Sequence, residues 1–474
     1  MTNWKTITEL ASELRTQKTT VRELVEEAQK RARASKDLHA YLEVFDDLDD
    51  DIVRAEEIIA HDKEGMHPLA GIPVAIKDNV LIHGKRTTAA SHMLENYVAS
   101  YDATVIETLR KEGAVIVGRT NMDEFAMGAS TERSFFGPTK NPHDTTRVPG
   151  GSSGGSASAV ASGTVPYALG SDTGGSIRQP AAFCGLVGFK PTYGAVSRYG
   201  LIAMGSSLDQ IGPLTNTVAD AEILFHTIRG HDVRDGTTLP DRENISSKKE
   251  HLTIGVPWHL LREGVDEDVL QVFEKTLSAL EREGHTLEDI TLPSSTHALA
   301  AYYIVMPAEA STNLARYDGV RYGLSREGNS LVEDYVRTRS EGFGEEVTRR
   351  ILIGTYVLSS GYIDAYYNKA ETLRHVLRKE YNDVFSKGVD VIATPTTPTP
   401  AFRFGEKKDP VSMYLADIFT VTANLTGFPA ISVPMGRVVR DGKDLPVGIQ
   451  YTAPHSREDL LFIAGEAVEK AEVY

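Results

Sequence analysis

The sequence predicts an α/β protein in which helices cover both faces of a central β-sheet. Two short apolar runs bounded by glycine, at residues 71–76 and 113–118, are typical of buried strands. A helical segment that ends at Gly113 separates them. Strand and helix signals go on alternating along the chain, which favours a sheet with helices on both faces. A chain of 474 residues can form two or three domains, or one large α/β unit.

The first sixty or so residues have the spacing of helices. Apolar Val21, Leu24, Val25 and Ala28 recur at helical intervals, and Thr20 with Glu23 forms a capping-box pattern at the start of that segment. The acidic run at 46–51 suits a helix N-terminus. We therefore expect an N-terminal helical segment, residues 1–65, packed on a catalytic domain formed by residues 66–474.

Further elements follow in order. Residues 156–163 predict a small-residue helix and 165–172 a strand. Residues 249–257 predict a strand, 269–284 an amphipathic helix and 300–385 mostly helix. The last predicted elements are a strand that runs into a proline-rich loop (388–400) and a hairpin that turns at Asp441-Gly442 (431–451).

Composition narrows the classes of function. The net charge of −16 opposes contact with a phosphate backbone, so a partner would have to hold any nucleic acid. The N-terminus has no signal-peptide pattern, no run is apolar and long enough to span a bilayer, and Cys184 is the only cysteine. We therefore expect a cytoplasmic protein. The histidines show no metal-binding spacing, so no metal site is expected.

Glycine and serine make up 15 of the 27 residues from Gly150 to Ser176. Such a run is either a flexible linker or a place where the backbone approaches a substrate. Strand-like and apolar segments surround it, which is unusual for a linker. Gly151 to Gly155 matches G-x-S-x-G, the nucleophile elbow of α/β-hydrolases, but the strand that must precede such an elbow is missing from the pattern. No phosphate-loop lysine follows the glycines.

Two further features point to acyl transfer. Backbone N–H groups from Thr173 to Ser176 can form an oxyanion hole, although a simple tight turn explains the same glycines. Lys77 follows an apolar strand, so its stem is expected to be buried and its pKa lowered enough to act as a base. The alternative interpretation of Lys77 is a surface charge at a strand end.

Together, Lys77, Ser152 and Ser176 resemble the Ser–cis-Ser–Lys triad of the amidase signature family. The segments 71–79, 149–163 and 170–194 carry this resemblance. It implies the amidase signature fold, with a central mixed sheet between helices. It also implies that Ser176 is the nucleophile, Ser152 the proton relay and Lys77 the terminal base.

The resemblance also places the oxyanion hole at the backbone of Thr173, Gly174 and Gly175. The segments 118–132, 190–213, 340–370 and 409–434 are similar to the glutaminase subunits of tRNA-dependent amidotransferases. That similarity implies substrate-binding roles: Arg350 for the glutamine α-carboxylate, Asp417 for the α-ammonium and Tyr302 for the pocket wall.

The same similarity implies a reaction. L-glutamine is hydrolysed, and its ammonia converts Glu-tRNA(Gln) to Gln-tRNA(Gln). It further implies a heterotrimer with subunits B and C, no cofactor on this chain, and ATP and Mg²⁺ in the reaction of the partner that also contacts the tRNA. Three alternatives stay open: a stand-alone amidase of small amides, a serine esterase of the α/β-hydrolase class, and a non-catalytic scaffold.

Overall fold

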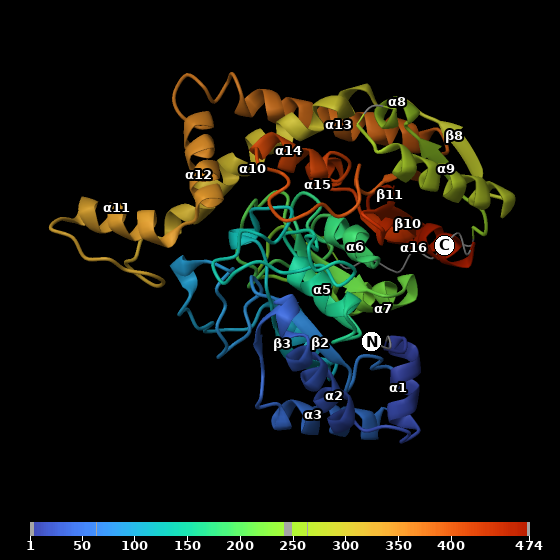
Figure 1. Cartoon of the computed structure of the whole chain (residues 1–474), viewed down its shortest axis with the longest axis horizontal. Helices are drawn as coiled ribbons and strands as arrows, with labels where there is room; N and C mark the ends of the chain where they lie inside the picture. Colours follow the sequence, from blue (N-terminus) through green and yellow to red (C-terminus); the bar gives the residue numbers. More distant parts are fainter. Residues whose placement is uncertain (1–3, 63, 241–248, 263, 472–474) are drawn as a thin grey trace.

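A computed structural model describes residues 4–62, 64–240, 249–262 and 264–471. Within these residues the strands form one mixed sheet in the order β1-β3-β2-β4-β6-β5-β10-β11-β9-β7-β8. Figure 1 labels β2 and β3 near one end of the molecule and β8 near the other. Strand β2 is parallel to β3 and β4, and β7 is parallel to β8 and β9, whereas every other neighbouring pair is antiparallel. The strands are β1 (Tyr41–Val44), β2 (Pro73–Lys77), β3 (Val115–Thr120), β4 (Tyr167–Asp172), β5 (Val187–Lys190), β6 (Gln210–Thr215), β7 (Thr253–Val256), β8 (Thr286–Asp289), β9 (Val391–Pro395), β10 (Ala430–Arg440) and β11 (Lys443–Thr452).

Helices join these strands and cover the sheet. The α-helices are α1 (Ile7–Arg15), α2 (Val21–Ala34), α3 (Asp49–His61), α4 (Thr104–Lys111), α5 (Gly154–Ala161), α6 (Arg178–Cys184), α7 (Val218–Ile228), α8 (Trp258–Leu261), α9 (Glu267–Arg282), α10 (Ala298–Asn313), α11 (Leu331–Gly342), α12 (Glu345–Val357), α13 (Tyr367–Ser386), α14 (Pro410–Tyr414), α15 (Val421–Thr426) and α16 (Glu458–Lys470). Short 3₁₀ turns are η1 (Lys36–Leu38), η2 (His92–Leu94), η3 (Glu124–Ala126), η4 (Pro293–His297), η5 (Leu314–Arg316) and η6 (Leu415–Asp417). None of the helices in the described part is long and apolar enough to cross a membrane.

Strand β5 shows that both faces of the sheet are covered. A Cβ placed on Gly188 would lie 2.6 Å from the side chain of Ala181 on α6. The ring of Phe189 lies 5.1 Å from Phe225 on α7 and 5.0 Å from Phe462 on α16. Because successive strand residues point to opposite faces, α6 lies on one side of the sheet, and α7 and α16 lie on the other. The predicted α/β architecture with helices on both faces is confirmed.

The N-terminal segment agrees with the prediction except at one place. Both α1 and α2 begin with a capping box, and that of α2 is the predicted pair Thr20 and Glu23. However, Tyr41–Val44 form β1, an edge strand antiparallel to β3, so this segment is not purely helical. A strand of only four residues between helices is too short to show the alternation of apolar and polar residues by which a strand is recognised in a sequence. The N–H of Ile7 on α1 donates to Asp220 on α7 at 2.9 Å, while the domain boundary at residue 65 stays a prediction.

The other sequence predictions are confirmed in α5 with β4, in α9 with β7, in β9 and in the β10–β11 hairpin. Asp441 and Gly442 have φ values of +53° and +73° at the hairpin turn, as a two-residue turn of this kind requires. Strands β5, β6 and β8 and helices α6 and α16 were not predicted. In β6, Pro213 pairs opposite Leu169, and a proline argues against a strand when only the sequence is read.

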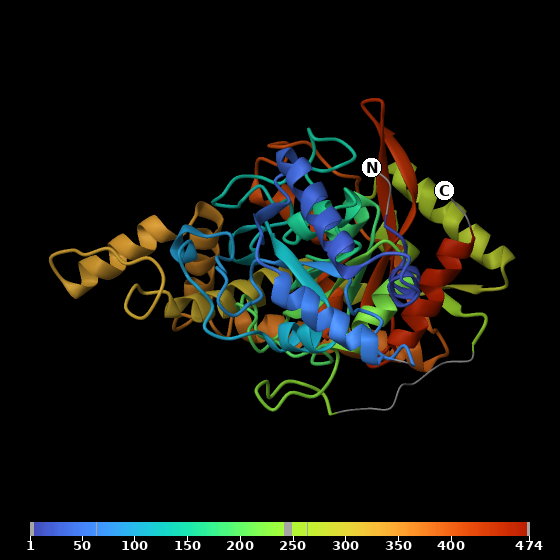
Figure 2. The ribbon, with the colours of Figure 1, turned by 90° about the horizontal axis from the view of Figure 1, so that it is seen from below.

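Residues 300–385 are mostly helical, as predicted. Helix α10 packs against α12, α13 and α15, whereas α11 projects away from the body in both views (Figures 1 and 2). Tyr302 on α10 contacts Gly174 in the loop that follows β4.

Candidate active site

Lys77 is the last residue of β2, which lies between β3 and β4. Its side chain is fully buried, so the alternative of a surface charge is wrong. Its Nζ donates hydrogen bonds to the hydroxyls of Ser152 at 2.8 Å, Ser153 at 2.9 Å and Ser171 at 3.0 Å. Burial lowers the pKa of Lys77 to about 7, although three nearby carboxylates act in the opposite direction. The amine is therefore available as a base near neutral pH.

The first part of the glycine and serine run is a fixed turn. The peptide bond between Gly151 and Ser152 is cis. The N–H of Gly151 donates to Gln179 Oε1 at 2.9 Å, and the carbonyl of Ser152 accepts from the N–H of Asp123 at 3.3 Å. A Cβ on Gly151 would lie only 2.2 Å from Asp123 Oδ2. Glycine is needed there for close packing, so the linker interpretation is wrong.

Ser176 lies in the loop between β4 and α6, beside this turn. Its carbonyl accepts a hydrogen bond from the N–H of Ser153 at 3.2 Å. The residue is 8% exposed, and its hydroxyl has no hydrogen-bond partner among the described residues, Ser152 included. The Ser176 hydroxyl is thus free to meet a substrate, next to the serine that Lys77 holds.

The backbone around Ser176 differs from the prediction at one donor. Within the described ranges, the N–H groups of Thr173, Gly174 and Ser176 have no acceptor. The N–H of Gly175 instead donates to Asp172 Oδ1 at 2.9 Å, because that carboxylate folds back over its own loop. Gly175 is therefore not a free oxyanion donor, whereas Thr173 and Gly174 stay candidates.

Arg178 fixes this loop from its other side. Its guanidinium is fully buried and donates to both carboxylate oxygens of Asp172, each at 3.0 Å. It also donates to Gln450 Oε1 at 2.6 Å and to Asn424 Oδ1 at 2.7 Å. Burial acts to raise the pKa of Asp172, but the charge and hydrogen bonds of Arg178, together with Lys190 and Asn424, outweigh it and bring that pKa to about 2. The ionised carboxylate thus holds the loop that carries Ser176. No pattern in the sequence indicated this pairing.

Helical elements bring the three predicted substrate-binding residues to the same side. Tyr302 on α10 lies against the loop, because a Cβ on Gly174 would be 2.5 Å from its hydroxyl oxygen. Asp417 is in η6, and the nearby Thr420 hydroxyl donates to the Gly174 carbonyl at 2.6 Å. Arg350 is on α12, and its charge acts on Asp417.

Arg350 and Asp417 are a buried cation and a buried acid without a direct ion pair between them in the described chain. Burial raises the pKa of Asp417 to about 8, and Arg350 opposes that rise only in part. The Asp417 carboxyl group makes no hydrogen bond to any other described residue. Both groups therefore have unused capacity for a ligand that carries charges of both signs.

The sequence interpretation missed some supporting residues. Ser153 and Ser171 complete the contacts of Lys77, and Ser153 follows Ser152 directly in the motif. Glu346 accepts a hydrogen bond from Arg350 Nε at 2.9 Å. The two are four residues apart on α12, and that helical spacing was a usable signal.

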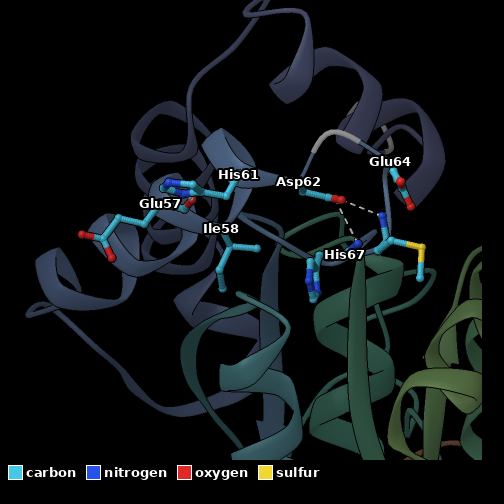
Figure 3. Close-up of a pocket in the computed structure, with 7 residues that line it drawn as sticks. Glu57, Ile58, His61, Asp62, Glu64 and His67 are labelled. Atoms are coloured by element: carbon cyan, nitrogen blue, oxygen red, sulfur yellow. Dashed lines mark hydrogen bonds between the residues drawn. The ribbon is translucent and has the colours of Figure 1, made fainter.

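A hollow lies at the end of α3 (Figure 3). The Asp62 carboxylate accepts from the N–H groups of Met66 at 2.8 Å and His67 at 3.0 Å there. The residues that line this hollow include none of the predicted site residues. In the described chain, no group of three or more His, Cys, Asp or Glu side chains can hold a metal ion.

Comparisons with known proteins extend over nearly the whole chain. The family model described as Amidase matches residues 23–462. A protein named as the A subunit of glutamyl-tRNA(Gln) amidotransferase, from Carboxydothermus hydrogenoformans, is 53% identical, over 90% of this chain and 87% of its own length. Its namesake from Geobacillus thermodenitrificans is 50% identical over 99% and 97%. The crystal structure of the same amidotransferase's A subunit from Thermotoga maritima is 45% identical, covers 96% and 94%, and superposes with a TM-score of 0.76.

Proposed function

The chain belongs to the amidase family, and we propose that it is the glutaminase subunit of a tRNA-dependent amidotransferase. It hydrolyses L-glutamine and supplies ammonia that converts misacylated Glu-tRNA(Gln) to Gln-tRNA(Gln). The observation that carries this proposal is the buried Lys77 bound to Ser152, next to a free Ser176 hydroxyl on a loop that Tyr302 and Thr420 contact. The relatives are named as subunits of a glutamyl-tRNA(Gln) amidotransferase, which supports Glu-tRNA(Gln) as the acceptor of the ammonia.

The proposed first half-reaction forms an ester on Ser176. As the Ser176 oxygen attacks the side-chain amide carbon of glutamine, its proton passes to Ser152, and the proton of Ser152 passes to the neutral amine of Lys77. This relay requires Ser152 and Ser176 to come together when substrate binds, as catalytic hydrogen bonds commonly do. The N–H groups of Thr173 and Gly174 stabilise the oxyanion.

Collapse of the tetrahedral intermediate breaks the carbon–nitrogen bond. The proton held by Lys77 returns through Ser152 to the leaving nitrogen, which departs as ammonia. In the second half-reaction a water molecule attacks the glutamyl ester and gives up one proton along the same relay. Glutamate leaves, and the Ser176 hydroxyl is restored.

Substrate recognition follows from the two buried charged groups. The Arg350 guanidinium pairs with the α-carboxylate, and ionised Asp417 pairs with the α-ammonium. Tyr302 closes the wall beside Gly174, where the amide has to lie. A site that pairs both charges rejects simple amides, because those leave the terminal nitrogens of Arg350 and the Asp417 carboxyl group buried without a ligand partner.

We infer partner subunits B and C from the relatives, and no cofactor on this chain. The larger of these partners uses ATP and Mg²⁺ and also grips the tRNA. A cytoplasmic setting is expected from the sequence. The net charge of −16 supports leaving tRNA to a partner. The surface also suits a partner, since exposed large apolar side chains concentrate on α11, α12 and the residues around them. These are Val320, Tyr322, Leu331, Val332, Tyr335, Val336, Leu352, Ile353, Tyr356, Tyr362, Ile363 and Tyr366.

The direct test is purification of the chain with whatever binds it, followed by an ammonia assay with L-glutamine. We expect one larger and one smaller protein to co-purify, and glutamine to drive conversion of Glu-tRNA(Gln) in the presence of ATP. Recovery of the chain alone, with hydrolysis of small uncharged amides, would instead identify a stand-alone amidase.

A further inference from the structure

Arg350 lies at the edge of a pair of stacked aromatic rings. The rings of Tyr303 and Tyr414 are 3.7 Å apart between centroids and 20° from parallel. The guanidinium carbon of Arg350 is 5.5 Å from both ring centroids. The guanidinium thus packs against both rings, which restrict where it can lie.

Glu346 connects the guanidinium to one of these rings. Its Oε1 accepts from Arg350 Nε at 2.9 Å and from the Tyr414 hydroxyl at 3.0 Å, while its Oε2 accepts from Arg349. The Glu346 side chain is buried. Burial acts to raise its pKa, but Arg350 and the hydrogen bonds hold that pKa below the ordinary value. The carboxylate is thus ionised and has a donor on each oxygen.

These contacts leave the other end of Arg350 free. Nε is taken by Glu346, and Nη1 lies 3.7 Å from the sulfur of Met306. Nη2 has no acceptor among the described residues. A guanidinium held at Nε presents its two terminal nitrogens in a fixed fork, the geometry that binds a carboxylate through two hydrogen bonds.

We propose that Glu346 is a positioning residue which, with Tyr414, fixes the Arg350 guanidinium and thereby selects amide substrates that carry a free α-carboxylate. The inference rests on the proposed glutaminase function and names the residues that set the preference for glutamine over amides without an α-carboxylate. Glu346 does not touch the substrate, and its influence acts entirely through the orientation of Arg350.

The test compares two amides in the complex purified with its partners. L-glutamine carries the α-carboxylate, and L-glutaminamide replaces it with a neutral amide. For Glu346→Gln we expect the KM for glutamine to rise about tenfold with kcat within about twofold, because the ionic support of Arg350 is lost. The kcat/KM for glutaminamide should change less than about twofold, so the preference for glutamine falls about tenfold.

Two further variants separate positioning from general damage. Glu345→Gln makes the same change one residue away on α12, at an exposed side chain that binds Arg349 at 2.7 Å, and should leave both substrates unaffected. Tyr414→Phe keeps the stacked ring and removes only the hydroxyl that Glu346 accepts. We expect it to raise the KM for glutamine about threefold. The inference therefore remains testable even if the Glu346→Gln protein folds poorly.

The outcomes are distinguishable. If wild-type protein releases ammonia in a Ser176-dependent manner but neither variant changes its preference between the two amides, Glu346 has no positioning role. An equal loss on both substrates would equally overturn the inference, since it indicates structural damage. If the wild-type complex releases no Ser176-dependent ammonia from glutamine, the proposed function fails, and this inference fails with it.

Discussion

Two halves of the candidate site are built in opposite ways. The catalytic half joins strand ends and tight loops, and Lys77 is held there by three serine hydroxyls. The recognition half places Tyr302, Arg350 and Asp417 on three separate helical elements, with Asp417 lacking any hydrogen bond from its carboxyl group within the described chain. The contact between Lys77 and Ser152 is in place before the substrate arrives, so only the contact between Ser152 and Ser176 has to form on binding. A binding site, in contrast, has to keep its charged groups unpaired until the ligand supplies their partners.

The largest effects are expected from substitutions that remove catalytic groups and leave the recognition half unchanged. Ser176→Ala removes the nucleophile and should lower kcat for ammonia release from glutamine by on the order of 10³-fold or more. Lys77→Ala should do the same, and the double variant should be no worse than either single one, because the residues act as a unit. Single-turnover ammonia measurements on the assembled complex would show this.

A matched serine serves as the control. Ser158 is buried on α5 within the same glycine and serine run, but its hydroxyl donates to the Lys140 carbonyl at 3.0 Å, away from Lys77. Ser158→Ala should keep kcat within about threefold. An active Lys77→Ala protein would point to a serine esterase with another base. An active Ser176→Ala protein would leave the chain as a scaffold.

The two halves were also unequally predictable from the sequence. Glycine-bounded apolar runs identified β2 and β3, and Lys77 at the end of one of them could be a buried base or a surface charge until it was considered together with the serines. The order of the strands was out of reach, since β5 has only four residues and β6 contains Pro213, so neither strand was predicted. Local patterns also could not show that Asp172 would take the N–H of Gly175.

On the recognition side, the residues taken alone resemble ordinary surface charges. Arg350 and Asp417 were assigned only through resemblance to a family, because their meeting depends on how α12 and η6 pack. Helical spacing does pair Arg350 with Glu346, yet it cannot reveal that Tyr414, 68 residues away, shares that carboxylate. Contacts within one element are visible in a sequence, while contacts between distant elements are not.

A substitution at Arg350 should weaken substrate binding without changing the chemical step. Arg350→Lys keeps the charge but loses the planar fork, so the KM for glutamine should rise about 10–100-fold with kcat changed less than about threefold. Steady-state ammonia assays on the complex would measure both constants. Arg337→Lys, on exposed α11, is the matched control and should change neither constant. A fall in kcat with an unchanged KM would assign Arg350 to the catalytic half.

The third prediction uses pH to read the catalytic half. Because the pKa of Lys77 is lowered to about 7, the neutral amine becomes scarcer as pH falls below that value. At saturating glutamine, kcat should fall about tenfold per pH unit below pH 7 and level off above it. A pH–rate profile from about pH 5.5 to 8.5 tests this. A flat profile would show that no group with this pKa acts as the base.

The smallest expected effect is a proton released by the recognition half. With its pKa raised to about 8, Asp417 is mostly protonated at pH 7 in the free site, and it must ionise to pair with the α-ammonium of glutamine. Binding at pH 7 should therefore release close to one proton, and release should disappear as pH rises well above 8. Affinity for glutamine should improve about fivefold between pH 7 and pH 8 for the same reason.

Calorimetry of the Ser176→Ala complex in buffers of different ionisation enthalpy counts that proton without turnover of the ligand. The matched ligand is 4-carbamoylbutanoate, which keeps the carboxylate for Arg350 but lacks the α-amino group, so it should bind without proton release. Equal release with both ligands would place the titrating group elsewhere. If glutamine binds without releasing a proton, Asp417 is already ionised in the free site. The charges in both halves of the site would then be set before the substrate binds.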